Sequence, residues 1–350
     1  MLMPMTTVAC YQATAADQPL SKGTLDRREL RDDDILIEIE YAGICHSDIH
    51  TVRDEWGGAR FPLTPGHEIV GRIVELGSGV TGFSVGERVG VGCMVDSCGD
   101  CEHCAVGDEH YCTTGSTPTY NGIDRRDGSV TQGGYSTHLP VNARFAVRIP
   151  ESLDPAATAP LLCAGITTYS PLRRWGAGPG TRVAVVGMGG LGHVAVKLAV
   201  ALGAEVSVFS HSLAKEADGK RFGASGYYAT SEEAFYRPHK NSFHLIINTV
   251  SAPQDVNDYI KMLRPEGILV LLGAPGVNYD VSPGLLMRGK TMAGSMIGGM
   301  RETQEMIDFC AEHGITAEIE LIDAEQINDA YERVIASDVR YRFVIDAKTF

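Results

Sequence analysis

Cysteine, histidine and acidic residues between Tyr41 and Val70 have the types and spacing of a metal site. The segment reads YAGICHSDIH, then a spacer, then PGHEIV, so Cys45 and His67 each follow closely after a glycine. A catalytic zinc ion takes three protein ligands and keeps one position open for water or substrate. Cys45 and His67 could be two of these ligands, with Glu68 a further ligand or a neighbour of the metal. A buried cysteine and an ordinary surface histidine are the simpler interpretation until other segments are considered.

A second group of cysteines follows in CMVDSCGDCEHCAVGDEHYC, with the spacing C-x2-C-x2-C-x7-C. Its members are Cys98, Cys101, Cys104 and Cys112. Four thiolates that converge without an open position form a structural zinc site. An iron–sulfur cluster and free thiols are the alternatives. Bacterial ferredoxins continue with x3-C-P, however, whereas Thr113 follows the last cysteine here. The spacing therefore predicts a structural zinc ion.

A glycine-rich turn connects an apolar strand, VAVVG, to a segment with the pattern of a helix. The turn reads GMGGLG, which fits G-x-G-x-x-G. Gly187 would make the tight turn, Gly189 would let a pyrophosphate approach, and Gly192 would allow the helix to pack closely on the strand. Gly190 and Leu191 complete the loop, and the helix N-terminus would face the phosphates. This pattern predicts a dinucleotide-binding domain.

The second strand of that domain distinguishes between the two nicotinamide cofactors. An NAD-binding domain usually ends this strand with an acidic residue that holds the ribose hydroxyls. Glu205 stands at the start of the strand EVSVFS, and the end reads Ser210, His211 and Ser212, with Lys215 shortly after. These groups can hold a 2′-phosphate, and no carboxylate is there to repel it. They are also common turn residues, but together with the missing acid they favour NADP(H) over NAD.

Two patterns of secondary structure position these residues. Short alternating strands at 34–44 and 69–77, separated by Gly and Pro turns, are typical of a β-rich, barrel-like domain. Apolar strands that alternate with helices from about residue 153 onwards are typical of a doubly wound parallel sheet. The C-terminal part is too short to be a domain, so we expect it to pack on the N-terminal one. The predicted domains are 1–152 with 295–350, and 153–294.

An alanine-rich run follows Asp154 and Pro155 and has the signals of a helix start, with Asp154 as the N-cap. This predicted helix would carry Cys163. A lone cysteine on an apolar helix is usually a small core residue. Cys163 gains a chemical role only if the fold brings it to Cys45 and His67.

Composition excludes several classes of partner. The 350-residue chain has a formal net charge of -14, a poor match for nucleic acid or anionic membranes. No apolar run reaches the roughly 18 residues of a membrane span, and the opening segment lacks the basic region of a signal peptide. Nine cysteines in a chain without an export signal favour metal binding over disulfides. We therefore expect a cytoplasmic, metal-binding protein with no nucleic-acid or membrane partner.

Together these segments resemble the zinc-dependent medium-chain alcohol dehydrogenases, and more narrowly their NADP-dependent, cinnamyl-alcohol-dehydrogenase-type branch. The resemblance extends over nearly the whole chain. Besides the four-cysteine run, the motifs that carry it are GICHSDIH (43–50), PGHE (65–68), PLLCAGITTYSPL (160–172), GMGGLGH (187–193), GSMIGG (294–299) and VRYRFVID (339–346). It implies an α/β fold with a β-rich GroES-like catalytic domain and a Rossmann domain. It also implies an enzyme that interconverts primary alcohols and aldehydes by hydride transfer.

The resemblance assigns roles around the catalytic metal. The zinc ligands would be Cys45, His67 and Cys163. Glu68 would be a neighbour able to approach the metal when water leaves, and Asp48 would accept a hydrogen bond from the ligand histidine. Ser47, the nicotinamide ribose and His50 would form a proton relay, to which the ordinary pKa of histidine is suited. With the four-cysteine site, this gives two zinc ions per chain.

Further assignments rest on the resemblance alone. The residues expected near the nicotinamide are Thr167, Thr249, Gly273, Ser295, Met296 and Ile297, and Arg342 would reach the pyrophosphate. The expected walls of the substrate pocket are Trp56, Pro118, Tyr120, Met296 and Ile297. Branch members that favour large aromatic alcohols often carry a tryptophan near position 118, where this chain has proline. We therefore expect a broad range of aromatic and medium aliphatic substrates.

Oligomeric state and two alternative functions complete the expectations. The family branch is commonly dimeric, and the apolar strand near 285–297 could be the edge that joins a homodimer. A polyol or secondary-alcohol dehydrogenase of the same superfamily is one alternative function. A non-catalytic nucleotide-binding protein is the other, but the presence of Cys45, His67 and Cys163 speaks against it.

Overall fold

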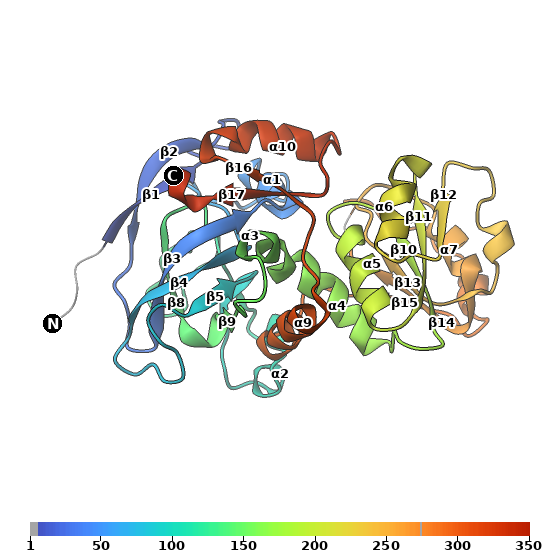
Figure 1. Ribbon diagram of the computed structural model, residues 1–350, viewed down its shortest axis with the longest axis horizontal. Coiled ribbons are helices and arrows are strands. Elements are labelled where there is room, and N and C mark those ends of the chain that lie inside the picture. The colour runs from blue at the N-terminus through green and yellow to red at the C-terminus, as the bar shows by residue number, and fades with distance from the viewer. Residues whose placement is uncertain (1–5, 274) are drawn as a thin grey trace. The chain divides into compact units, whose positions relative to one another are not determined.

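The computed structural model describes residues 6–273 and 275–350, and its internal contacts divide the chain into two compact units (Figure 1). The first unit comprises the chain up to Cys163 and again Gly298–Phe350. The second unit is Ala164–Ile297. Both boundaries lie somewhat later in the sequence than the predicted ones. Within the described ranges, no helix combines the length and the apolar character that crossing a bilayer requires.

The first unit is built on a seven-stranded sheet with the order β16-β17-β3-β4-β5-β9, in which β8 pairs with β3. Its strands are β3 (Asp34–Gly43), β4 (Ile69–Leu76), β5 (Arg88–Val91), β8 (His138–Asn142), β9 (Val147–Arg148), β16 (Ile319–Ile322) and β17 (Arg342–Asp346). Ile35, Ile37 and Ile39 alternate along β3 and are buried, as the sequence pattern indicates. The antiparallel pairing of β17 with β3 brings the C-terminal segment onto this sheet.

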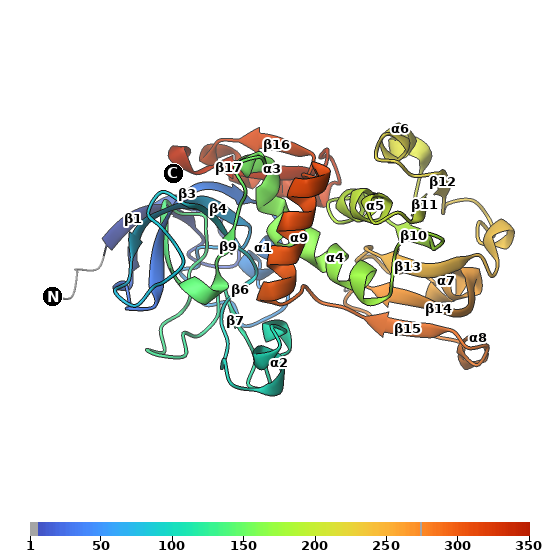
Figure 2. The same ribbon diagram turned by 60° about the horizontal axis from the view of Figure 1, so that its bottom comes forward.

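Shorter elements complete the first unit (Figure 2). Two small sheets pair β1 (Thr6–Gln12) with β2 (Ser21–Arg27) and β6 (Met94–Asp96) with β7 (Thr117–Pro118). The α-helices are α1 (His46–Val52), α2 (Glu102–Ala105), α3 (Pro155–Thr158), α9 (Met300–His313) and α10 (Ile327–Ile335). The 3-10 turns are Glu109–Tyr111, Ala143–Phe145, Ala159–Leu162, Ala324–Gln326 and Ala347–Thr349.

The alanine-rich run after Asp154 is not one helix. Asp154 caps α3 as predicted, since its carboxylate accepts a hydrogen bond from the Ala157 N–H at 2.8 Å. A 3-10 turn replaces the α-helix at Ala159, next to Pro160, which has no N–H to donate. Cys163 follows that turn with φ −123° and ψ −67°. The prediction that a helix carries Cys163 is therefore wrong, because this cysteine occupies a break in the helical backbone.

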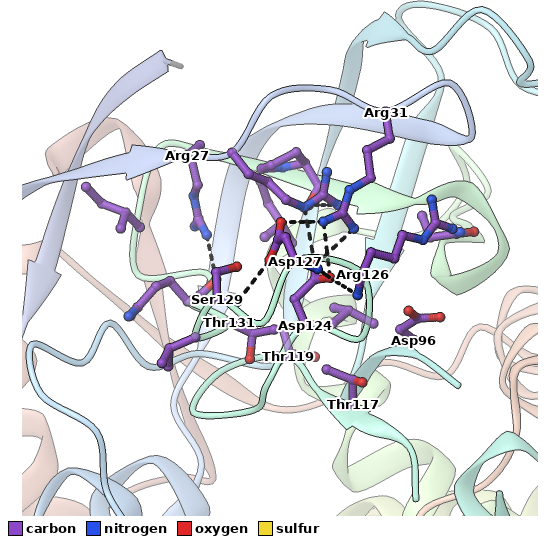
Figure 3. Close-up of a pocket in the computed structure, with 18 of the residues that line it drawn as sticks. Arg27, Arg31, Asp96, Thr117, Thr119, Asp124, Arg126, Asp127, Ser129 and Thr131 are labelled. Carbon is purple, nitrogen blue, oxygen red and sulfur yellow. Dashed lines mark hydrogen bonds and ion pairs between the residues drawn. The ribbon is translucent and has the colours of Figure 1, made fainter. Parts of the chain in front are cut away.

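A polar cavity of about 330 Å³ lies in the first unit and contains a network of ion pairs (Figure 3). Arg31 reaches both Asp124, with an Nη1–Oδ2 distance of 3.0 Å, and Asp127, with an Nη2–Oδ2 distance of 2.5 Å. Arg126 also lines the cavity and pairs with Asp33. These pairs tie the 124–131 loop to the segment between β2 and β3. None of the predicted metal ligands lines this cavity.

The second unit contains a six-stranded parallel sheet with the order β12-β11-β10-β13-β14-β15. Its strands are β10 (Arg182–Val186), β11 (Glu205–Ser210), β12 (Gly226–Ala229), β13 (Phe243–Asn248), β14 (Leu263–Leu271) and β15 (Thr291–Gly294). Its helices are α4 (Ala164–Arg174), α5 (Gly192–Ala201), α6 (Glu216–Arg221), α7 (Val256–Met262) and α8 (Pro283–Leu286), with 3-10 turns at Leu213–Lys215 and Arg237–His239. The predicted doubly wound sheet is confirmed.

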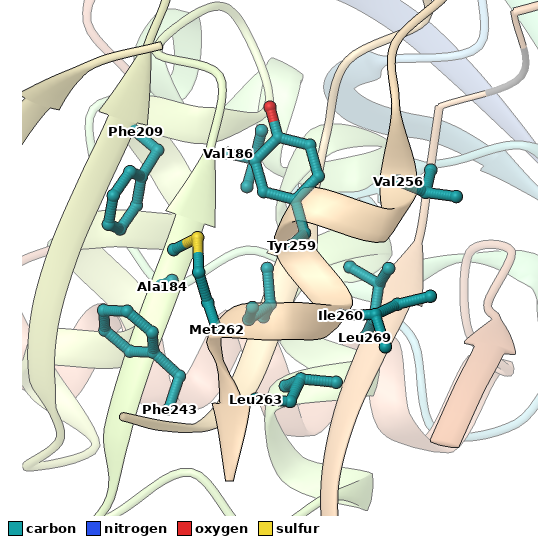
Figure 4. Packing of buried hydrophobic residues seen from close by; sticks show 11 residues of the cluster. Ala184, Val186, Phe209, Phe243, Val256, Tyr259, Ile260, Met262, Leu263 and Leu269 are labelled. Carbon is teal, nitrogen blue, oxygen red and sulfur yellow. The ribbon is translucent and has the colours of Figure 1, made fainter. Parts of the chain in front are cut away.

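A hydrophobic core holds α7 against this sheet (Figure 4). Phe209 of β11 and Phe243 of β13 meet edge to face, with ring centroids 5.6 Å apart. Ala184 and Val186 of β10 lie in the same buried cluster as Ile260 of α7. Because both faces of β10 are covered, the strand is apolar at every position from Val183 to Val186.

Candidate functional site

Four buried side chains of the first unit converge as a metal site would require. The ligand atoms of Cys45, His67, Glu68 and Cys163 all lie within 4.8 Å of one another. The sulfur atoms of Cys45 and Cys163 are 4.0 Å apart. Tetrahedral zinc with Zn–S bonds of about 2.3 Å would hold two sulfurs about 3.8 Å apart, so this pair fits the ion. The three predicted ligands come from the start of α1, the approach to β4 and the break before α4.

The contact between the Cys45 and Cys163 thiols shifts the pKa of both. The hydrogen bond from Cys163 lowers the pKa of Cys45 well below its usual range. The same contact raises the pKa of Cys163, which acts as the donor. The thiolate is the form that binds zinc, so one ligand is held in its binding form by the fold itself.

Asp48 orients the histidine of this set. Its Oδ1 lies 3.0 Å from Nδ1 of His67, and the carboxylate is fully buried. Burial alone would lower the pKa of His67, but the Asp48 carboxylate raises it well above its usual range. Donation from Nδ1 leaves Nε2 as the nitrogen available to a metal. The Asp48–His67 contact is the one that the family resemblance implies, and the role of Asp48 beside a bound metal stays a prediction.

Glu68 lies beside the ligands and pairs with Arg342 of β17. The Arg342 guanidinium donates from Nη2 to Glu68 Oε1 at 2.5 Å and to the Ile44 carbonyl at 2.8 Å. Burial raises the pKa of Glu68 to about 8, although Arg342 opposes this shift. The Oε2 atom has no hydrogen-bond partner among the described residues. Sequence reasoning did not foresee this pair, and the expected contact of Arg342 with a pyrophosphate stays a prediction.

Helix α1 carries the two predicted relay residues. Ser47 Oγ lies 3.7 Å from the Cys45 sulfur, next to the metal ligands. His50 lies three residues further along, so it is on the same face of the helix. Its Nδ1 contacts Glu55, and its ring lies 4.9 Å from that of Trp56. Ser47 is therefore close to the metal site, whereas His50 is partly exposed.

The four-cysteine cluster forms a second convergent set. The ligand atoms of Cys98, Cys101, Cys104 and Cys112 lie within 4.8 Å of one another, and the Cys98–Cys104 sulfur distance is 3.8 Å. Backbone N–H groups support the sulfurs, as Cys104 N–H to Cys101 Sγ at 3.5 Å illustrates. The N–H groups of Cys104 and Thr113 lower the pKa of Cys101 to about 5. This all-thiol set fits a closed structural zinc site.

The glycine turn of the second unit connects β10 to α5 and has the geometry of a phosphate loop. Gly187 has φ +92°, which favours glycine, and a Cβ on Gly192 would lie 2.0 Å from the Gly187 carbonyl oxygen. Among the described residues, apart from the two chain neighbours of Gly189, no heavy atom lies within 4 Å of a Cβ built on this glycine, so that side of the loop is open. Gly190 and Leu191 complete the approach to α5. Thr249 supports the turn by donating to the Val186 carbonyl at 2.8 Å.

The ends of β11 differ in charge as the sequence indicates. Glu205 begins the strand and Ser210 ends it. His211 and Ser212 follow and are exposed, and Ser212 Oγ accepts a hydrogen bond from the Ala214 N–H at 3.4 Å. Lys215 ends the 3-10 turn that Ser212 caps. The carboxyl end of β11 thus presents hydroxyls, an imidazole and an ammonium group.

The residues assigned by resemblance alone lie on several elements. Thr167 is buried within α4, Gly273 follows β14, and Ser295 donates its N–H to the Leu271 carbonyl at 3.2 Å. Ile297 has φ +43°. Among the expected pocket walls, Tyr120 lies beside the predicted ligand His67, with their ring centroids 5.7 Å apart. Pro118 lies in β7, and Trp56 and Met296 are each 59% exposed.

Two residues near the metal ligands were not identified from the sequence. Cys93 has its sulfur 4.0 Å from the Leu162 carbonyl oxygen, next to Cys163 in the chain. Tyr135 directs its hydroxyl to Asp48 Oδ2 at 3.3 Å. Burial and the Asp48 charge raise the pKa of Tyr135 well above its usual range, so this hydroxyl stays protonated. No motif marks either residue, and only their positions in the fold reveal them.

Family models match both parts of the chain. Residues 31–151 match the alcohol dehydrogenase GroES-like domain, and residues 190–312 match the zinc-binding dehydrogenase domain. The chain is 57% identical to NADP-dependent alcohol dehydrogenase C 1 of Mycolicibacterium smegmatis over 98% of each sequence. It is 50% identical to aldehyde reductase YahK of Escherichia coli, covering 96% of this chain and 97% of that protein.

Solved structures of similar proteins have the same fold. Cinnamyl alcohol dehydrogenase SbCAD4 of Sorghum bicolor is 42% identical, with a TM-score of 0.94 and 98% of each chain covered. CAD of Helicobacter pylori, solved in complex with NADP(H), is 38% identical, with a TM-score of 0.93 and 99% of each chain covered.

Proposed function

Because the chain belongs to the zinc-binding alcohol dehydrogenase family, in the NADP-dependent branch that contains the cinnamyl alcohol dehydrogenases, we propose that it interconverts primary alcohols and aldehydes with NADP(H). It is an oxidoreductase. The observation that carries the proposal is the convergence of Cys45, His67 and Cys163 at one buried point. A non-catalytic member of the family would have no need to keep this ligand set.

Each unit contributes residues for one task of the proposed reaction: the first would bind the metal, and the second would bind the cofactor. When bound, zinc supplies a Lewis acid for the substrate oxygen, and NADP(H) carries the hydride. Cys45, His67 and Cys163 would hold the metal, with Asp48 fixing the histidine tautomer. In the second unit the open backbone at Gly189 would receive the pyrophosphate, and the N-terminus of α5 would favour its negative charge.

Ser47 and His50 form the proposed path for the proton. Ser47 lies beside the ligand Cys45, where it would exchange a proton with the substrate oxygen. His50 lies one helical turn further along and is partly exposed, so it would pass the proton to solvent.

Preference for NADP(H), substrate range and assembly are part of the proposal. Ser210, His211, Ser212 and Lys215 would hold the 2′-phosphate, and the substrates would be aromatic and medium aliphatic aldehydes.

We expect two zinc ions per chain and a homodimer joined through β15, which is an edge strand of its sheet. We also place the protein in the cytoplasm, where cysteines are kept reduced and can serve as metal ligands. Light scattering should give twice the 37.6 kDa chain mass, and a value for one chain would contradict the dimer.

A substrate panel run with both cofactors tests the function directly. Purified enzyme should reduce benzaldehyde, cinnamaldehyde and a medium-chain aliphatic aldehyde with NADPH, and its kcat/KM should be lower with NADH. A preference for NADH would contradict the role of Ser210 to Lys215. Turnover of polyols or ketones alone would indicate the secondary-alcohol alternative. No turnover of any substrate by zinc-loaded protein would indicate a non-catalytic protein.

A further inference from the structure

Four donors surround the buried carboxylate of Asp48. Oδ1 lies 3.2 Å from the Gly66 N–H nitrogen and 3.0 Å from Nδ1 of His67. Oδ2 lies 3.0 Å from the Cys45 N–H nitrogen and 3.3 Å from the hydroxyl of Tyr135. Each oxygen thus accepts two hydrogen bonds, which fills the usual capacity of a carboxylate. Three of the donors come from a metal ligand or its neighbour, and only Tyr135 comes from a distant segment.

The segment that carries Tyr135 pairs by its backbone with the residues just before His67. The Gly133 N–H donates to the Thr64 carbonyl at 2.7 Å, and the Tyr135 N–H donates to the Pro65 carbonyl at 2.9 Å. The Gly134 N–H donates to the Gly66 carbonyl at 3.0 Å. A Cβ on Gly66 would lie 2.6 Å from the Tyr135 ring, so the two segments touch without space for a side chain.

Arg27 of β2 holds the same segment from its other side. Its guanidinium donates to the Gln132 carbonyl at 2.6 Å, to the Gly133 carbonyl at 2.7 Å and to Ser136 Oγ at 2.6 Å. The side chain is buried, with 6% of its surface exposed. A buried cation that bonds to three groups of one loop restricts the movement of that loop. Arg27 therefore holds the Tyr135 segment through contacts that do not involve the proposed metal ligands.

We propose that Tyr135 is a positioning residue of the catalytic metal site, whose hydroxyl fixes the Asp48 carboxylate and through it the orientation of His67. This inference rests on the zinc role of Cys45, His67 and Cys163 in the proposed function. Loss of the hydroxyl would leave one lone pair of a buried carboxylate unsatisfied and fix the orientation of the carboxylate toward His67 less firmly. Partners that orient a metal ligand from outside typically change metal affinity or activity by about 10- to 100-fold when they are removed.

Zinc release from Tyr135→Phe tests the proposal without relying on activity. A colorimetric chelator should remove the catalytic zinc roughly tenfold faster than from the wild type. Release from the four-cysteine site of the same molecules should keep its wild-type rate and serves as an internal reference. Tyr11→Phe is the matched control, because Tyr11 is also buried in the first unit but packs against Phe350, with ring centroids 5.9 Å apart. It should release both ions at wild-type rates.

A double-mutant cycle separates positioning from general destabilisation. If the hydroxyl acts through the carboxylate, Tyr135→Phe should accelerate zinc release in the wild type but have little further effect in Asp48→Asn. Equal effects in both backgrounds, or an unchanged rate in Tyr135→Phe, would overturn the proposal. Wild-type protein that holds no zinc at Cys45, His67 and Cys163 would instead refute the proposed function, so the two failures are distinguishable.

Discussion

At the scale of single residues, the chemistry depends on side chains that reach the metal ligands from distant parts of the chain. Cys45 and His67 could be recognised from residue type and spacing, but Cys163 could be linked to them only through resemblance to a family. Arg342 pairs with Glu68 although the two residues are 274 positions apart in the sequence. Sequence spacing carries no signal for such a contact, because it arises when β17 pairs with β3.

Cofactor selectivity should depend on the residue that ends β11. Ser210→Asp would place a carboxylate where the 2′-phosphate of NADP is expected, and like charges repel. We expect kcat/KM for NADPH to fall about tenfold or more, a change of about 1.4 kcal/mol, with a smaller effect on NADH. Glu205→Gln changes a carboxylate at the opposite end of the strand and should leave the ratio unchanged. Unaltered selectivity in Ser210→Asp would show that the phosphate binds elsewhere.

At the scale of elements, two glycines in the turn from β10 to α5 have different expected roles. Gly192 is needed for folding, and Gly189 is needed for cofactor binding. Gly192→Ala would bring a Cβ against the Gly187 carbonyl, so we expect it to lower the free energy of unfolding by about 1–3 kcal/mol. The new Cβ of Gly189→Ala meets no described residue within 4 Å other than its chain neighbours, so stability should hold or rise slightly. Its methyl group should still block the pyrophosphate and weaken NADPH binding about tenfold or more. Tight NADPH binding by Gly189→Ala in a titration would contradict the phosphate-loop assignment.

Ion pairs between the 124–131 loop and the start of β3 should make stability depend on pH. The hydrogen bond from Arg126, with Nη1 and Oδ1 2.7 Å apart, lowers the pKa of Asp33 from 3.8 to about 2. A lowered carboxyl pKa stabilises the fold above the unfolded value near pH 4, and that contribution is lost as the pH falls toward 2. Because both side chains are substantially exposed, we expect only about 0.2–1 kcal/mol.

Chemical denaturation of Arg126→Ala as a function of pH measures this contribution. Near neutral pH the variant should be slightly less stable than the wild type, and the difference should shrink between pH 4 and pH 2. Arg125→Ala is the matched control, since Arg125 hydrogen-bonds to Thr114 and, within residues 6–273 and 275–350, pairs with no carboxylate. A difference for Arg126→Ala that persists at pH 2 would rule out the ion pair as its cause.

The periodicity of apolar residues predicted the long strands well but did not predict where a helix is interrupted. The predicted strands at 34–44 and 69–77 correspond to β3 and β4. This prediction succeeded because apolar and polar residues alternate along a strand that is buried on one face. The break at Cys163 was missed, since alanine-rich sequence favours a helix and a single proline does not tell where the helix ends. That break gives Cys163 its position beside Cys45, so the error concerned a functional residue.

At the scale of the whole molecule, the chain leaves the first unit at Cys163 and returns to it at Gly298. The alternation of strands and helices predicted an inserted dinucleotide-binding unit, and the shortness of the C-terminal segment predicted its return. The exact transitions were not predicted: the first falls within the apolar run PLLCAG, and the second falls within the short segment GSMIGG, which is not accompanied by a longer linker. The first unit holds both proposed zinc sites, and the second holds the proposed cofactor site.

The zinc content of the wild type and of Cys163→Ala tests the central claim most directly. Metal analysis of freshly prepared protein should find two zinc ions per wild-type chain and one in Cys163→Ala, because the four-cysteine site is unaffected. The variant should also lose aldehyde reduction while it still binds NADPH, since its second unit is intact. Two zinc ions and retained turnover in Cys163→Ala would contradict the assignment of Cys45, His67 and Cys163 as the catalytic metal site.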